Sequence, residues 1–263
     1  MKRSFVIFVT ILILSLILAG CGGGEPANKL EAVKQNGKMI VGTSADYPPY
    51  ESKDEAGIFV GFDMDLIREI GKRIGVEVEI QDMAFDTLIT AVQEGKVDAV
   101  IAAMQATAAR EENVDFSNPY HWQKDAFLAA ANSPITMSHP EDAAGYKIGV
   151  QTGTVQETWV LDHLVPLGTT EDMIFRYERV DQGALDVKNG RIDLLFINAD
   201  PAAALAEKEG LMLALVTDET VDSGQAIAVM NGETAFKSEI DRILQEMEQD
   251  GTIQKLLDQH GIP

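Results

Sequence analysis

The sequence predicts an α/β protein built of two lobes that are joined by extended crossings. Segments with strand character alternate with segments of helical spacing from residue 38 to residue 103, and the same alternation returns from residue 147 to residue 209. This order is typical of mostly parallel sheets with helices on both faces. An extended apolar run at Ala126–Ala131 stands between the two halves, and we expect it to be a crossing segment.

The first half begins with a short apolar strand, which the pair Pro48-Pro49 prevents from continuing. The clearest helix follows, because apolar residues recur at helical spacing from Met64 to Ile74 and Gly75 then provides a C-cap. The expected elements are strands at residues 38–43, 76–80 and 97–103, a loop at 44–50, and helices at 63–74 and 85–93.

The second half shows the same signals and ends in two amphipathic helices. Its expected strands are residues 147–150, 174–179 and 193–197, its helices are 154–161, 182–189 and 201–209, and a last strand at 225–230 precedes helices at 233–249 and 252–259. The carboxyl ends of both sheets should meet at a cleft between the lobes. Ligand sites favour such places.

The first twenty residues predict a secretory signal. Lys2 and Arg3 precede an apolar run that is shorter than the roughly 20 residues needed to span a bilayer. The run ends in LAGC and resembles a bacterial lipoprotein box, in which Cys21 would be lipidated; secretion without a lipid is the alternative. We therefore expect a signal peptide at 1–20, a lipidated cysteine and flexible tether at 21–36, and a protein anchored at the cell envelope.

The chain is strongly acidic, with 21 Lys+Arg against 42 Asp+Glu. Removing residues 1–20 takes away Lys2 and Arg3 and no acid, so the remaining charge is 19 − 42 = −23. This charge argues against a surface for nucleic acid or for an anionic membrane. The only cysteine cannot form an internal disulfide, and the four histidines lack metal-ligand spacing, so we expect no metal and no cofactor.

One strand and the turn after it form the clearest candidate site. The strand at 97–103 leads to Thr107, which opens a helical turn that contains Arg110. A chain that leaves a strand and turns into a helix presents free backbone N–H groups, which suit an anion. A guanidinium can hold a carboxylate with two hydrogen bonds, although a surface arginine on a polar helix is the alternative reading.

Six blocks of sequence resemble the extracellular solute-binding proteins, family 3, which serve polar amino-acid ABC importers. The blocks are GTSADYPPYE (42–51), GFDMDLIREIGKRIGV (61–76), FDTLITAVQEGKVDAVIAAM (85–104), T-x-x-R (107–110), VDFSNPY (114–120) and GVQTGTVQE (149–157), and the tail DGTIQKLLDQHG (250–261) is similar too. The resemblance implies a type II periplasmic-binding-protein clamp. Its first lobe would be residues 37–122 and 220–263, and its second lobe 123–219.

The resemblance also implies a ligand site. In it, Tyr47 and Phe85 would be aromatic walls, and Arg110 would hold the α-carboxylate of the ligand. The helix that starts at Thr154, with Glu157 at capping-box spacing, would offer N–H groups to the same carboxylate. The full implied set is Tyr47, Phe85, Ala102, Ala103, Gln105, Thr107, Arg110, Thr154, Val155, Gln156 and Asn198.

Three positions depart from the pattern of the family. Relatives usually place Asp where this chain has Asn198, to hold the ligand's ammonium, and Asp200 could substitute for it. Ser44 stands where some binders of cationic amino acids carry Asp, and Gln105 stands where many relatives have a small hydroxyl residue. We therefore expect a neutral polar amino acid as ligand, with an acidic amino acid or a non-amino carboxylate as alternatives.

The expected function is that of a monomeric binding protein that delivers its ligand to a permease. A secreted enzyme of the cyclohexadienyl dehydratase type resembles the same family and is the alternative. Such an enzyme needs a general acid at the cleft, and after the strand at 193–197 no glutamate occurs before Glu207. We expect no catalytic residues.

Overall fold

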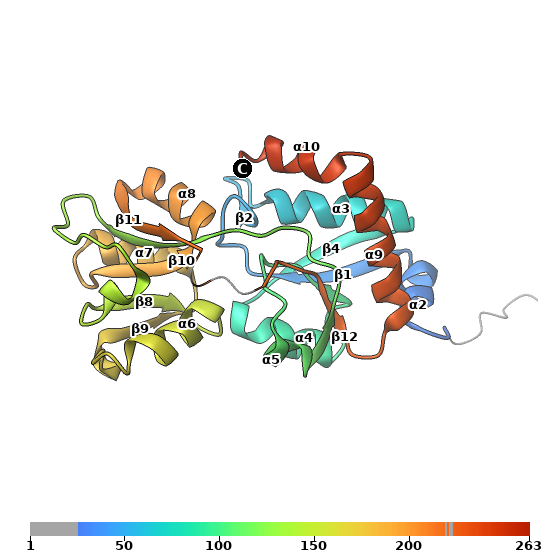
Figure 1. Ribbon diagram of the computed structural model, residues 1–263. Coiled ribbons are helices and arrows are strands. Elements are labelled where there is room, and N and C mark those ends of the chain that lie inside the picture. The colour runs from blue at the N-terminus through green and yellow to red at the C-terminus, as the bar shows by residue number, and fades with distance from the viewer. Residues whose placement is uncertain (1–25, 219, 221–222) are drawn as a thin grey trace, which may run out of the picture.

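The computed structural model describes residues 26–263 apart from 219, 221 and 222, and within these ranges it consists of two α/β lobes side by side (Figure 1). Each lobe is built on a five-stranded sheet, in the order β4-β1-β5-β12-β6 in the first and β11-β7-β10-β8-β9 in the second. The structure therefore confirms the two α/β lobes. The predicted signal peptide and Cys21 lie outside the described residues.

All strands of the first sheet but one run in the same direction. Its strands are β4 (Glu77–Asp82), β1 (Lys38–Thr43), β5 (Ala99–Val100), β12 (Ala228–Met230) and β6 (Val114–Phe116). β12 is antiparallel to both of its neighbours, and the other pairs are parallel. A separate hairpin pairs β2 (Ser52–Lys53) with β3 (Phe59–Val60).

Helices cover both faces of this sheet. One face carries α2 (Lys29–Asn36), α3 (Phe62–Ile74), α9 (Thr234–Gln249) and α10 (Thr252–Gln259), and the other carries α4 (Leu88–Gln93) with the 3₁₀ turn Phe85–Thr87 (Figure 1). Gly75 ends α3 in the left-handed conformation (φ 92°), as predicted. The prediction of a flexible tether at 21–36 is wrong for its second half, because these residues form α2, which packs against the core through the buried side chain of Val33.

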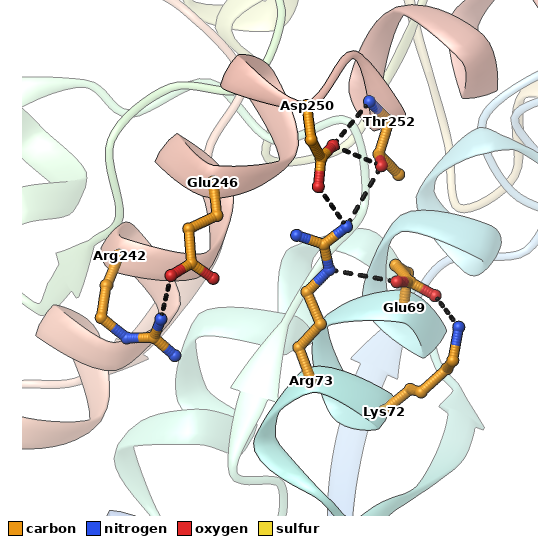
Figure 2. A network of polar contacts seen from close by, with 7 residues as sticks. All are labelled: Glu69, Lys72, Arg73, Arg242, Glu246, Asp250 and Thr252. Carbon is orange, nitrogen blue, oxygen red and sulfur yellow. Dashed lines mark hydrogen bonds and ion pairs between the residues drawn. The ribbon is translucent and has the colours of Figure 1, made fainter.

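The C-terminal helices are held to α3 by polar contacts as well as by packing. Arg73 on α3 binds Glu69 one turn back (3.0 Å), Asp250 at the end of α9 (2.8 Å) and the hydroxyl of Thr252 (3.1 Å) (Figure 2). Exposed pairs of this kind contribute roughly 0–1 kcal/mol each, so burial of the apolar helix faces dominates. No helix in the described ranges is both long and apolar enough to cross a membrane.

The second sheet repeats the arrangement with one reversed strand. Its strands are β11 (Leu211–Thr217), β7 (Asp125–Ala130), β10 (Leu194–Asn198), β8 (Ile148–Gln151) and β9 (Ile174–Tyr177). β7 is antiparallel to β10 and to β11. The expected crossing segment at Ala126–Ala131 is wrong: β7 is an interior strand of the second sheet, which explains why its side chains from Ala126 to Ala129 are fully buried.

The helices of the second lobe lie close to their predicted positions. α7 (Val180–Lys188) and α8 (Ala199–Glu209) cover one face, and α6 (Val155–Trp159) with the π turn Val160–Leu164 covers the other. Short 3₁₀ turns occur at Pro140–Ala143 and Glu171–Met173. The sequence pattern missed β11 because its burial does not alternate and its register shifts between Leu213 and Leu215.

Two crossings join the lobes: residues 117–124 lead from β6 to β7, and a return crossing, described at residues 218, 220 and 223–227, lies between β11 and β12. They are bonded to each other, since Tyr120 N donates to Gln225 O (2.9 Å) and Gln225 N donates to His121 O (2.8 Å). The predicted strand at 225–230 is therefore shorter in the structure. Its first three residues belong to the return crossing.

Candidate functional site

A small cavity lies between the lobes, where strands of both sheets end. Its volume is about 10 Å³, room for about one water molecule, so the lobes are closed on each other. The first lobe lines it with Ser44, Asp46, Tyr47, Glu51, Phe85, Ala102, Ala103 and Gln105, and the second with Gln151, Thr154, Gln156 and Asn198. Thr107 and Val155 line a separate groove at the lobe boundary instead.

Tyr47 joins the two lobes through its hydroxyl. The hydroxyl donates to Asn198 Oδ1 (2.9 Å) and accepts from the backbone N–H of Asn198 (3.0 Å). Burial raises the pKa of Tyr47 well above its usual value, so the phenol stays protonated. The side chain therefore works as a fixed neutral donor and acceptor inside the cavity.

The chain between β5 and α5 (Ala108–Glu111) owes its shape to a buried acid. Asp63, at the start of α3, accepts the N–H of Ala103 (2.7 Å) and the hydroxyl of Tyr120 (2.9 Å). Ala103 has a left-handed backbone (φ 46°), which a non-glycine residue rarely adopts without such support. This bend explains why the strand predicted at 97–103 is only Ala99–Val100, and it turns Ala102, Ala103 and Gln105 toward the cavity.

Arg110 reaches from the first lobe to the second. Thr107 caps its helical turn, as predicted, by accepting from Arg110 N (3.3 Å). The guanidinium donates to Gln105 O (2.8 Å) and, across the lobe boundary, to Gly153 O (3.0 Å), and it lies 5.4 Å from the centre of the Phe85 ring. Gln105 and Phe85 line the cavity, whereas Arg110 itself does not and lies behind them.

The start of α6 supplies the facing side of the site. Thr154 accepts from Glu157 N (3.2 Å), and Glu157 accepts in return from Gly153 N (2.7 Å), one residue before the position that a standard capping box uses. Thr154 lines the cavity while it caps the helix. The structural and binding roles of this residue are therefore compatible.

Asn198 ends β10 and lines the cavity, and its side chain is fixed from behind. Its Nδ2 donates to Oδ1 of Asp125 (2.7 Å), which also accepts from Gln156 Nε2 (2.7 Å). Asp200 is placed elsewhere: it accepts from the hydroxyl of Tyr50 (2.7 Å) and does not line the cavity. Of these acids, Asp125 is therefore the one that stands behind Asn198.

Two further acids belong to the cavity. Asp46 accepts from Ser44 Oγ (2.9 Å) and, across the lobe boundary, from Val180 N (2.6 Å), and burial raises its pKa. Burial, together with the charge of Asp63, raises the pKa of Glu51 well above its usual value.

Glu51 and Asp63 form a buried carboxyl pair that shares one proton. Burial raises the pKa of Asp63 to about 7, while its bonds from Ala103 and Tyr120 favour the ionised form. Within the described residues, Glu51 Oε2 and Asp63 Oδ1 have no hydrogen-bond partner, and because each carboxyl shifts the pKa of the other we infer that a proton on Glu51 lies between them. Glu51 is accordingly the neutral acid and Asp63 the anion.

Sequence reasoning missed Glu51, Gln151 and Asp125 as site residues. Glu51 comes shortly after the Pro48-Pro49 loop, and its place after that loop was the one available signal. Gln151 and Asp125 stand at strand ends, where polar residues are common. Within residues 26–263, leaving out 219, 221 and 222, no group of three or more His, Cys, Asp or Glu side chains is arranged to hold a metal ion.

Comparisons with known proteins place this chain among binding proteins. A family model described as bacterial extracellular solute-binding proteins, family 3, matches residues 39–262. The arginine-binding extracellular protein ArtP of Bacillus subtilis (strain 168) is 30% identical over 258 residues, which cover 97% of this chain and 96% of that protein.

Solved structures give the same result for the fold. A structure of an ancestral arginine-binding protein bound to glutamine is 34% identical, covers 86% of this chain and 99% of its own, and has a TM-score of 0.78. The ancestral amino acid-binding protein AncCDT-1, a precursor of cyclohexadienyl dehydratase, is 29% identical over 89% of this chain and 99% of its own, also with a TM-score of 0.78. These likenesses confirm the two-lobed type II fold expected from the sequence.

Proposed function

The chain belongs to the bacterial extracellular solute-binding proteins, family 3, and on this premise we propose that it captures an amino acid between its lobes and delivers it to the permease of an ABC importer. The ligand enters while the lobes are apart, because the closed cavity of about 10 Å³ has room only for about one water molecule. Contacts with both lobes then favour the closed form.

The position of Arg110 is the observation that carries this proposal. Arg110 is 9% exposed, and the two terminal nitrogens of its guanidinium donate to carbonyl oxygens of different lobes. A carboxylate accepts such a pair of bonds more strongly than neutral carbonyls do. The N-terminus of α6, with Thr154 as its cap, faces the same place. Together these groups suit the α-carboxylate of an amino acid.

The side chain of the ligand is polar and uncharged in our proposal. Four carboxamides line the cavity, from Gln105, Gln151, Gln156 and Asn198, and they can both donate and accept hydrogen bonds. Tyr47 and Phe85 add flat apolar surface beside them. An acidic side chain fits less well, because it would lie beside the carboxyl of Asp46.

A cationic side chain is the second candidate, and Glu51 is the observation that favours it. This acid lines the cavity and is kept neutral by burial and by the charge of Asp63. A bound cation would stabilise the ionised form of Glu51 and release its proton. Binding of a cation would then tighten as the pH rises, whereas binding of a neutral amino acid would not depend on Glu51 in this way.

We also propose that the protein binds its ligand without converting it. Glu207, the acid considered from the sequence, is an exposed residue of α8. Mass spectrometry of the amino acid after prolonged incubation with the protein tests this point. Recovery of the unchanged ligand supports a binding protein, and a dehydrated product would show a dehydratase.

The protein acts, in our proposal, as an exported monomer that is anchored through a lipid on Cys21. The basic start, the apolar run and the LAGC sequence support this assignment. Intact-mass measurement of protein recovered from bacterial membranes tests it. A lipid mass on the fragment that begins at Cys21, absent from a Cys21→Ala variant, is the expected result.

A thermal-shift screen of the twenty amino acids tests the function itself. Ligand binding to the folded state stabilises it by RT ln(1 + [L]/Kd), about 4 kcal/mol at a thousandfold excess over Kd. We expect a large increase in Tm with one amino acid or with a few related ones. Absence of an increase with all twenty would contradict the proposal.

A further inference from the structure

We propose that Asp125 makes the cavity selective for a ligand with an amino group, acting as a positioning residue through the carboxamides of Asn198 and Gln156. This inference rests on the proposed function and names the residue that sets its ligand class. Asp125 does not line the cavity itself. The carboxamides of Asn198 and Gln156 do line the cavity, so Asp125 acts on the ligand through them.

The contacts of Asp125 link it to both amides and to a crossing. It is the first residue of β7, is 1% exposed, and stands directly opposite Asn198 in the antiparallel pairing of β7 with β10. Its Oδ1 accepts from Asn198 Nδ2 and from Gln156 Nε2, both at 2.7 Å. Its Oδ2 accepts from the hydroxyl of Thr220 on the return crossing.

These contacts fix which end of each amide faces away from Asp125. A carboxylate only accepts hydrogen bonds, so both amides must turn their NH₂ groups toward it. Their carbonyl oxygens are then left for other partners. In Asn198 this oxygen accepts from the hydroxyl of Tyr47 inside the cavity. The buried acid therefore converts Asn198 into an acceptor for donors that enter the cavity.

The charge of Asp125 adds to this orientation. Neutral amides cannot balance a cation, but a buried carboxylate on their far side can, because the surrounding dielectric is low. Its field reaches the cavity: after burial, the negative charge of Asp125 is among the causes that raise the pKa of Tyr47. An ammonium at Asn198 Oδ1 gains both the hydrogen bond and this charge. A ligand without an amino group leaves the oxygen of Asn198 without this donor and the charge of Asp125 without a cation to balance it.

The experiment compares each amino acid with its analogue that lacks the amino group. L-glutamine is paired with glutaramic acid, and L-arginine with 5-guanidinopentanoic acid; the pair used is the one whose amino acid binds the wild type. Isothermal titration calorimetry gives Kd for both compounds with the wild type and with Asp125→Asn. We expect the preference for the amino acid to fall by about tenfold or more, since one member of a buried charge pair is lost.

Two further variants separate selectivity from folding. In the double variant Asp125→Asn with Asn198→Asp, the carboxylate moves across the strand pairing, and we expect the preference to return to within about threefold of the wild type. Asp200→Asn is the matched control, because Asp200 is an acid just beyond β10 that bonds Tyr50 outside the cavity, and it should leave the preference unchanged.

An equal loss of affinity for both compounds in Asp125→Asn would overturn the inference, because it would show a merely structural role. If Asp125→Asn does not fold, the double variant decides alone: a preference at the level of the wild type supports the inference, and unselective binding overturns it. A wild type that binds none of the amino acids refutes the proposed function instead, so the two failures are distinguishable.

Discussion

Replacement of Arg110 by Ala should weaken ligand binding while the protein stays folded. Arg110 is nine-tenths buried, and its guanidinium donates from two nitrogens, to the cavity residue Gln105 (O at 2.8 Å) and to Gly153 O at 3.0 Å. Truncating one partner of a buried hydrogen-bonded charge pair costs about 2–5 kcal/mol. This cost corresponds to an increase in Kd of about 30-fold to about 5,000-fold.

Isothermal titration calorimetry with the amino acid found in the screen measures this change, and far-UV circular dichroism checks the fold. Arg110→Lys should recover part of the affinity, because it restores the charge and not the forked geometry. Arg179→Ala is the matched control: Arg179 is part-exposed and pairs across the lobe boundary with Asp82 at 3.5 Å, and Asp82, unlike Gln105, does not line the cavity. Its loss should change Kd by about fivefold at most. A folded Arg110→Ala protein with Kd within about threefold of the wild type would refute the assigned role.

Three other changes give separate tests. Gly153→Ala should weaken binding, because its Cβ would lie 3.0 Å from Asp86 Cβ across the closed boundary between the lobes. Gly190→Ala is the control: its φ is similar but the space around it is open, so it should lower Tm without changing Kd. Equal affinities of the two variants for the ligand would contradict this prediction. Thr154→Ala should lower the free energy of unfolding by about 1 kcal/mol in urea titrations through the lost cap, and an unchanged midpoint would refute this. Burial raises the pKa of Glu51 and raises that of Asp63 to about 7, so the folded protein binds protons more tightly than the unfolded chain, and the stabilisation of the protein by this pair is lost as the pH rises from about 4 to about 7. Over this pH range, Tm should therefore fall less in Glu51→Gln than in the wild type. Parallel curves of Tm against pH would contradict the shared proton.

Local patterns in the sequence predicted the elements well and the contacts between lobes poorly. Apolar spacing and Gly75 fixed the extent of α3, because helix signals lie within a few residues of one another. The strand at 97–103 was predicted too long, since the bend at Ala103 depends on Asp63, forty residues away. β7 looked like a crossing because a buried strand and an extended apolar connection have the same composition.

The candidate site shows the same division. Family resemblance supplied most of the positions that line the cavity, such as Tyr47 and Asn198, but no periodicity connects these two residues, which are 151 positions apart. The role of Asp125 depends on pairing between strands of the folded sheet. A single sequence contains no signal for such pairing, so an acid at the start of a strand could not be recognised as a partner of the site.

The way the crossings enter the sheets determines how force passes through the molecule. Each crossing leads into the one reversed strand of a sheet, β7 or β12, and each of these strands is hydrogen-bonded on both sides. A twist applied at either crossing therefore reaches an interior strand that is hydrogen-bonded on both sides, and not an edge strand. The hydrogen-bonded pair of crossings is therefore the place at which a hinge motion of the two lobes would be centred.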